Sequence, residues 1–517
     1  MAAALVSEMS ADSDGQFSAS VYETGRLVAL APSLRGHRER VHFLLDHQHA
    51  NGEWGGPDHY AIVPTLSATE ALLRDIELGS GQRLPYPAMV SAAERGLRAL
   101  FARLDGRAPI LPDTVAIELI VPALIIDINE HLAGKAGLDS VADGRLLPAP
   151  DGANAALLAR LRESVHQGRA LPRTLLHSLE VIGTPVRGAP SVEPNRGGVG
   201  CSPAATAAWL GDVAAGGNHH PFVRYLESVQ DVDGAVPVAA PLGLFERAWV
   251  LSTLAEAGLG STAERSLVQS IHTEFGEWGV AGGPGLPPDA DDTATALYAL
   301  ARYGRPRSPA CLWAYRAGAH FSCFPGERTP STSTNAHVLQ AFGACLTPDL
   351  PERSDYLQAM ARLTGWLADH QDDDGSWRDK WHASPYYATK CCVVALVEHG
   401  GAAGAAAASR AVRWVLDLQR PDGSWGHWVG TPEETAYALQ ILVRANDSGT
   451  GDVIARAAAR GCAFLLRAGG HHEHPPLWHD KDLYTPMRIV RAEVLAGLHL
   501  AHTDRRVRAL LSRGAAT

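Results

Sequence analysis

A short turn signature recurs along this chain and constrains its fold more than any other feature. Each close copy has an apolar residue, Gln four positions later, and a polar turn with Gly that ends in Trp. Close copies span 44–54, 367–377 and 415–425, and decayed copies span 226–234 and 275–279. Gly supplies the positive φ that ends a helix, Gln can bond the turn backbone, and Trp packs back on the helices. We therefore interpret each copy as a helix that ends in a clamped turn.

Amphipathic stretches with helical spacing lie between these turns, at 294–303, 335–344, 435–444 and 489–501. Helix pairs that repeat and close on themselves form an α-barrel. A chain of 517 residues is expected to form two large domains, and the Gly-rich stretch 211–221 is typical of a linker. The sequence thus predicts an all-α fold with two α/α-barrels, the first over 19–221 and the second from about 222 to the end.

Composition limits the partners and the compartment. The net charge is -11 and no long basic run occurs, which argues against nucleic acid. The seven cysteines are scattered without CxxC spacing, which favours free thiols in a reducing cytoplasm. The first residues carry acids where a signal peptide needs bases, and no apolar stretch reaches the ~18 residues of a membrane span. We expect a cytoplasmic chain without a transmembrane segment.

One acidic motif indicates chemistry. The stretch 287–294 reads PPDADDTA, and its prolines place Asp289, Asp291 and Asp292 at the start of a helix. Acids are ordinary there, because the helix dipole favours them. However, three carboxylates in four residues repel one another, so at least one should keep a proton if the site is buried. A carboxylic acid kept neutral in a dry pocket can act as a general acid.

Together with the repeated turns, this motif resembles the squalene-hopene and class II diterpene cyclases. Further segments resemble the diterpene branch, in particular bacterial copalyl- and halimadienyl-type diphosphate synthases: 115–122, 175–180, 331–339, 377–387 and 419–437. The resemblance covers about 20–500. Two segments depart from the family pattern: Ala116 and Ile117 replace Gly-Phe, and VYETGR at 21–26 replaces a YDTAW-like segment.

The resemblance implies two helical barrels, usually called β and γ. The γ barrel, 19–221, would be inserted into a β barrel made of 1–18 and 222–517. The acidic motif would then face a cavity between the two barrels.

The resemblance also implies roles for single residues. Asp291 would donate the proton, Asp289 and Asp292 would tune it, and Asn335 would hydrogen-bond the acid. Glu118 would bind Mg²⁺ and the diphosphate. Two cations and five aromatic residues are candidates for binding the diphosphate and the carbocation: Lys380, Arg173, Trp278, Trp313, Trp381, Tyr386 and Tyr387. Ordinary structural roles stay open: a helix cap for Asn335, an Arg partner for Glu118, surface positions for the cations and core packing for the aromatics.

The expected reaction is the protonation of geranylgeranyl diphosphate and its closure to a bicyclic copalyl (labdadienyl)-type diphosphate. Farnesyl diphosphate giving a drimenyl product, or a rearranged halimadienyl or clerodienyl diphosphate, are the alternatives. The acids at 372–374 belong to a turn, so no class I DDxxD motif is expected and the product keeps its diphosphate. A downstream class I terpene synthase would then be a partner. Protein prenyltransferase subunits, glycoside hydrolases and non-enzymatic binding barrels are rival interpretations, which incubation with a prenyl diphosphate separates.

Overall fold

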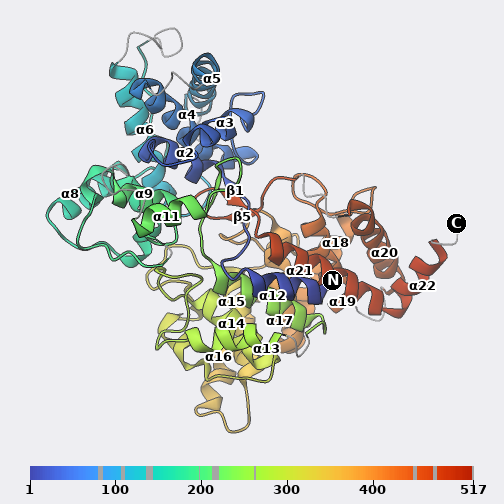
Figure 1. Ribbon diagram of the computed structural model, residues 1–517. Coiled ribbons are helices and arrows are strands. Elements are labelled where there is room, and N and C mark those ends of the chain that lie inside the picture. Colours follow the sequence, from blue (N-terminus) through green and yellow to red (C-terminus); the bar gives the residue numbers. More distant parts are fainter. Residues whose placement is uncertain are drawn as a thin grey trace.

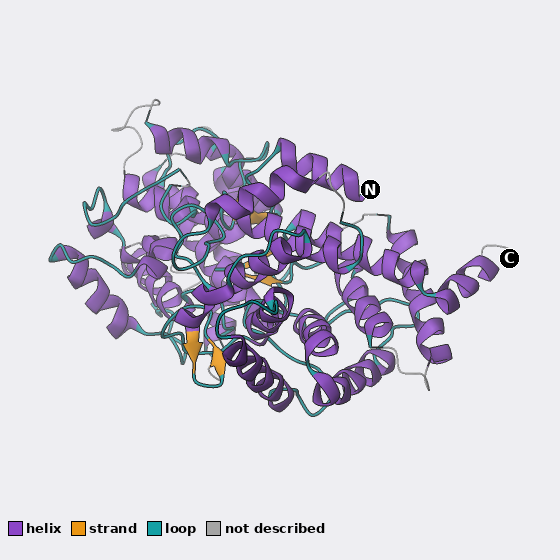
Figure 2. Cartoon of the chain, turned by 90° about the horizontal axis from the view of Figure 1, so that it is seen from below, coloured by secondary structure: helices purple, strands orange, loops and turns teal. Residues whose placement is uncertain are grey.

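The computed structural model describes residues 1–79, 85–105, 111–134, 144–196, 198–211, 220–260, 264–445, 451–469 and 474–514. Most of the predicted linker, 212–219, lies outside these residues. The predicted all-α class is confirmed, because the described chain is helical apart from three two-stranded antiparallel sheets (Figure 2). The strands are β1 (Ala19–Ser20) with β2 (Val236–Pro237), β3 (Arg316–Ala317) with β4 (His320–Phe321), and β5 (Trp478–His479) with β6 (Leu483–Tyr484). None of the described helices is long and apolar enough to span a membrane.

A closed ring of six inner helices makes up the described C-terminal part. Each helix contacts the next in this series, and the last contacts the first: α12 (Gly243–Glu256), α14 (Ala290–Arg302), α15 (Thr332–Cys345), α17 (Pro385–His399), α19 (Pro432–Arg444) and α21 (Met487–Thr503). Outside them lie α13 (Arg265–Glu274), η5 (Pro309–Tyr315), α16 (Arg353–Asp369), α18 (Gly401–Asp417), α20 (Gly451–Ala468) and α22 (Arg505–Gly514). An inner ring with an outer layer is the architecture of an α/α-barrel.

The inner helices run in the same direction. Phe245, Asp289 and Tyr387 come from the starts of α12, α14 and α17, and all three line one cavity. At the other ends of the helices, Arg444 donates to the backbone oxygen of Glu256 at 2.7 Å. The positive ends of these helix dipoles therefore face the cavity.

The N-terminal half forms a second ring. Its inner members are α2 (Val21–Leu30), α4 (Ile62–Leu78), α6 (Ile117–Gly134), the 3₁₀ segment η2 (Arg173–Ile182) and α9 (Pro203–Leu210). Around them lie α3 (His37–Asp46), η1 (Asp58–Ala61), α5 (Tyr86–Leu104), α8 (Ala155–His166), η3 (Thr184–Val186) and α11 (Pro221–Ser228). Figure 1 shows this half above the C-terminal ring, with β1 and β5 where the two meet.

The first helix, α1 (Ala2–Ala11), packs with the C-terminal ring. Its Leu5, Val6 and Met9 are buried in the hydrophobic core of that ring, and α1 contacts α21 (Figure 1). The chain thus leaves the C-terminal ring, builds the N-terminal one and returns. The exact boundaries at 18/19 and 221/222 stay predictions.

The three close copies of the turn signature share one geometry. Trp54, Trp377 and Trp425 are fully buried, and each indole N–H donates to the backbone oxygen of the helix before the turn at 2.6–2.8 Å. Each Gln donates both to its own turn and to a later helix; Gln371, for example, bonds Gly375 O and Ala407 O. The turn glycines have φ near +90°, as in Gly375 at 98°. The signature therefore fastens one outer helix to the next, as its sequence predicts.

The decayed copies lack this clamp. Gln230 donates to Leu226 O in the helix just before it, and Trp278 has 58% of its surface exposed.

We expect Gln371→Ala to lower the free energy of unfolding by about 1–3 kcal/mol, because two backbone oxygens lose their donor. Denaturant unfolding measures the change. Gln358→Ala, at an exposed position on the same outer helix α16, is the matched control and should change stability little. Equal stability of the two variants would show that the clamp is not needed.

Candidate active site

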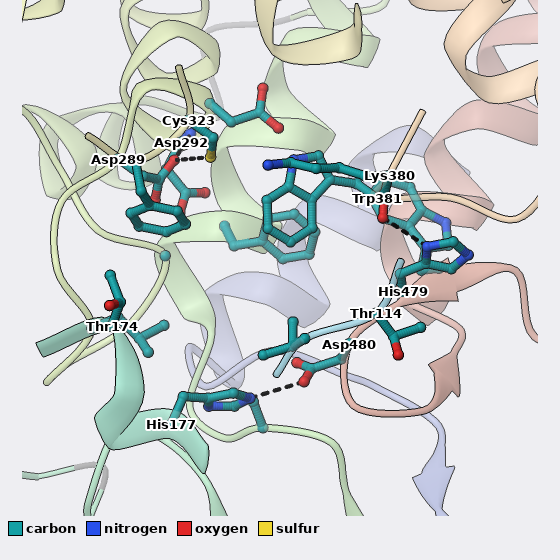
Figure 3. Close-up of a pocket in the computed structure, with 18 of the residues that line it drawn as sticks. Thr114, Thr174, His177, Asp289, Asp292, Cys323, Lys380, Trp381, His479 and Asp480 are labelled. Atoms are coloured by element: carbon teal, nitrogen blue, oxygen red, sulfur yellow. Dashed lines mark hydrogen bonds and ion pairs between the residues drawn. The ribbon is translucent and has the colours of Figure 1, made fainter. Parts of the chain in front are cut away.

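A cavity of about 370 Å³ lies between the two rings and takes its lining from both (Figure 3). The N-terminal half contributes Asp113, Thr114, Val115, Thr174 and His177. The C-terminal half contributes the acidic motif, cations and a wall of aromatic side chains. In Figure 3 Asp289, Asp292 and Cys323 lie on one side of the cavity, Lys380, Trp381 and His479 on another, and His177 with Asp480 on a third.

The acidic motif lies at the start of α14 as predicted. Asp289 is the N-cap residue, and its Oδ1 accepts from the Asp292 N–H at 2.8 Å. Asp289, Asp291 and Asp292 are all buried and all line the cavity. Burial raises the pKa of Asp289 to about 6, and burial with the Asp289 charge raises the pKa of Asp292 well above its usual value. The cluster therefore holds a proton at neutral pH.

Asp291 has a histidine partner that the sequence analysis did not identify. His337 on α15 places Nδ1 2.7 Å from Asp291 Oδ1. Burial would lower the pKa of His337, but the Asp291 charge, with Cys391 as a further contact, raises it to about 10. At neutral pH His337 is an imidazolium that donates to Asp291, and the edge of Trp249 packs on its ring.

The prediction that Asn335 hydrogen-bonds the acid is wrong. Its amide donates to Phe321 O and Ser331 O, and its oxygen accepts from the Phe321 N–H at 2.8 Å. These bonds use both amide hydrogens and one oxygen lone pair to hold β4 against the start of α15. The helix cap is not Asn335 either, because Ser331 caps α15. His337, two residues later, takes the expected place beside the acid.

Two of the five predicted aromatic residues line the cavity: Trp381 and Tyr387. The other three lie elsewhere, contrary to prediction. Trp278 is exposed, Trp313 packs against Phe342 and Tyr356, and Tyr386 packs against Trp414. The rest of the aromatic wall comes from residues without a motif signal: Phe245, Trp249, Phe324, Trp478 and Tyr484. Trp478 is within 4.7 Å of Tyr387, centroid to centroid, so the wall is continuous.

Lys380 lines the cavity, as expected of a diphosphate ligand, and its role stays a prediction. Its Nζ lies 2.5 Å from Glu327 Oε2 and 5.0 Å from the centre of the Trp381 ring. Arg173 was also predicted to bind there, but its side chain is exposed and its neighbour Thr174 lines the cavity instead. Arg328, which the sequence analysis missed, is the second cation of the lining.

Glu118 is half-buried near the same edge of the cavity. Its Oε1 lies 3.6 Å from Arg328, which is itself 71% exposed. The described residues contain no cluster of three or more His, Cys, Asp or Glu side chains suited to a metal. A single carboxylate at the cavity edge nonetheless fits the way Mg²⁺ is bound, through one or two carboxylates together with phosphate oxygens and water, and the Mg²⁺ role of Glu118 stays a prediction.

His177 and Asp480 form an ion pair at the cavity wall. His177 Nε2 lies 2.9 Å from Asp480 Oδ1, and Nδ1 lies 2.7 Å from the backbone oxygen of Gly200 (Figure 3). Both ring nitrogens thus meet acceptors, which favours the doubly protonated ring. Burial opposes the charge, but Asp480 raises the pKa of His177. His177 belongs to the 175–180 segment, although the sequence analysis assigned no role to it.

Comparisons with known proteins agree with this geometry. Residues 328–485 match the protein family described as the squalene-hopene cyclase C-terminal domain. The chain is 45% identical to an ent-copalyl diphosphate synthase of Streptomyces sp. (strain KO-3988), over 98% of this chain and 97% of the relative. It is 43% identical to a labda-7,13-dienyl diphosphate synthase of Streptomyces clavuligerus, over 98% and 93%. The solved structure of ent-copalyl diphosphate synthase from Streptomyces platensis matches with a TM-score of 0.91 at 45% identity, covering 97% of this chain and 99% of that one.

Asp291→Asn should lower the pKa of His337. We expect an NMR titration midpoint of about 10 for His337 in the wild type. In the variant the midpoint should fall by at least about one unit. Burial disfavours the charged His337 ring, and the Asp291 carboxylate that offsets this effect has been removed.

Asp289→Asn is the matched control and should leave the midpoint of His337 near its wild-type value. The folded pKa of His337 lies above the unfolded value of about 6.5. The stability from this bond is therefore complete below pH ~6.5 and is lost as the pH rises through about 10. A wild-type midpoint near 6.5 would contradict the ion pair.

Proposed function

The chain belongs to the class II diterpene cyclases, and from this membership we propose that Asp291 protonates the terminal alkene of a prenyl diphosphate bound between the two rings. The internal alkenes then attack the resulting carbocations in turn and close two carbocycles, and loss of a proton from the bicyclic cation ends the reaction. The product is a bicyclic diphosphate of the copalyl type, and the diphosphate stays attached throughout.

The pairing of Asp291 with His337 at the wall of an aromatic cavity carries this proposal. An alkene is a very weak base, so the proton must come from an acid whose conjugate base is stabilised as it forms. The imidazolium of His337 stabilises the carboxylate that Asp291 leaves behind. Asp292 holds a proton in the same helix turn, and Asp289 and Asp292 together tune the donor.

The aromatic wall serves the carbocation. Faces of aromatic rings attract cations, and a lining of rings keeps out water that would quench the charge. Trp249, Tyr387 and Trp478 line the cavity together. We assign them the walls around the two forming rings.

We place the diphosphate end at Lys380 and Arg328, beside which Thr329 also lines the cavity. These groups can donate to phosphate oxygens. Glu118 would hold Mg²⁺ beside them, and the bound metal would supply further positive charge to the diphosphate.

Geranylgeranyl diphosphate is the proposed substrate, since copalyl and labdadienyl diphosphates are bicyclic C20 compounds. Farnesyl diphosphate and a drimenyl product are the alternative. The predicted turn position of the 372–374 acids is confirmed, because Asp374 Oδ1 accepts from the Ser376 N–H in the repeated turn. We therefore expect another enzyme to remove the diphosphate. We propose a class I terpene synthase in the cytoplasm as the partner that consumes the product.

Incubation with geranylgeranyl diphosphate and Mg²⁺, followed by a phosphatase and mass analysis, should give a bicyclic C20 alcohol. We expect kcat/KM at least about tenfold above that for farnesyl diphosphate, because each further buried CH₂ contributes about 0.8 kcal/mol. A preference for farnesyl diphosphate would move the assignment to the drimenyl product. Release of free pyrophosphate would contradict class II chemistry.

Asp291→Asn keeps the shape of the side chain and removes the acidic proton. We expect kcat to fall by more than the roughly 10²–10⁴-fold of ordinary general-acid catalysis. Substrate binding and folding should stay near wild type.

Asp289→Asn is the control within the motif and should retain part of the activity, because Asp289 tunes the donor. Appreciable turnover by Asp291→Asn, with none by Asp289→Asn, would show that Asp289 and not Asp291 donates the proton.

A further inference from the structure

A small chamber lies behind the catalytic acid, inside the C-terminal ring. It measures about 20 Å³, enough for about one water molecule. Trp249 and Tyr387 line both this chamber and the substrate cavity, and so separate the two. His337 lines the chamber while its Nδ1 bonds Asp291 in the cavity wall. His337 is thus the link between the chamber and the acid.

The chamber is lined by ionic and polar groups from the inner helices. They are Ser252, Thr253, Glu256, Thr295, Tyr298, His337, Gln340, Lys390, Cys391 and Glu493. The outer elements α16 and η5, which also pack on α15, contribute no residue to it. Within the described residues, Thr295 Oγ1 and Tyr298 OH are buried without a hydrogen-bond partner, as expected beside a water site.

Two carboxylates in the chamber face one lysine. Lys390 Nζ lies 3.2 Å from Glu493 Oε1 and 3.5 Å from Glu256 Oε2. Glu493 also accepts from Thr253 and Gln440, so Lys390 and Glu493 form a complete pair without Glu256. Glu256 accepts from Gln340 and has no closer cation than Lys390 in the chamber. Its charge is therefore partly available to His337.

The reactive state needs this second anion. When Asp291 carries its proton it is neutral, and it no longer balances the imidazolium of His337. A buried imidazolium without an anion would lose its proton. With Asp291 neutral, the cations His337 and Lys390 still face the anions Glu256 and Glu493. Arg444, which also lies beside Glu256, has its own partner in Glu398 at 3.8 Å, so the buried charges cancel.

We propose that Glu256 is a positioning residue that keeps His337 protonated and oriented while Asp291 holds the proton for the substrate. It acts across the chamber by its charge, while Cys391 is the further hydrogen-bond partner of the His337 ring. This role rests on the proposed function for its use in catalysis. The titration of His337 itself does not depend on that function.

Glu256→Gln tests the proposal without leaving Lys390 unpaired, since Glu493 remains. The background is Asp291→Asn, which mimics the neutral acid. There we expect the NMR midpoint of His337 to stay above neutral pH, and to fall by at least about one unit when Glu256→Gln is added.

Glu246→Gln is the matched control, a buried carboxylate on the same helix that pairs with Arg488. It should leave the midpoint unchanged. A midpoint that does not move with Glu256→Gln, or that moves equally with Glu246→Gln, would overturn the proposal.

Turnover supplies the second measurement. With Asp291 intact, Glu256→Gln should lower kcat at least about tenfold with little change in KM, because an interaction used in the transition state is weakened. The alkaline limb of the pH profile should move to lower pH, and Glu256→Asp should restore part of the activity. Unchanged kcat and pH profile would show that Glu256 is only structural. If the wild type formed no cyclised product, the proposed function would fail while the titration result still stood.

Discussion

The buried ammonium group of Lys481 holds the two rings together, and the cavity depends on it. Its Nζ lies 2.5 Å from Glu23 Oε1, 2.9 Å from Glu180 Oε1 and 2.8 Å from Ser202 Oγ. All three partners belong to the N-terminal ring, whereas Lys481 belongs to the β5–β6 hairpin. A buried charge is tolerated only when it is fully paired. The hairpin is therefore fixed in one position, and it carries Trp478, Asp480 and Tyr484 into the cavity wall.

The direction of the inner helices imposes a conflict that the side chains resolve. Helix N-termini that face the cavity favour the diphosphate and disfavour a carbocation. The aromatic wall offsets this effect where the carbocation forms, and it also excludes water. The same N-terminal field favours ionised carboxylates, whereas burial favours neutral ones. Burial prevails at Asp292, whose pKa is raised, while Asp291 is balanced by His337.

The sequence was sufficient for features that depend on local geometry. The clamped turns and the helix start at Asp289 follow from residues within a few positions of one another. The partner of the acid does not: Asn335 and His337 lie two positions apart on α15, which turns their side chains about 200° from each other. The rotation of α15 against α14 decides which one meets Asp291, and no local pattern reports it. The prediction of the aromatic wall was incomplete for the same reason. Phe245 and Trp478 line the cavity only because the helices close into a ring, and no local pattern reports that closure.

The packing of α1 against α21 has a consequence for biosynthesis. Helix α1 finds its place in the core only after α21, which follows it by most of the described chain, has been synthesised. Leu5, Val6 and Met9, which belong to that core, then stay exposed while the segment between α1 and α21 is translated. Contacts between distant parts of a chain form slowly, and exposed apolar surface invites aggregation in the interval. The N-terminal ring, whose segments are contiguous, can form while the chain still grows, so the two rings are expected to mature at different times.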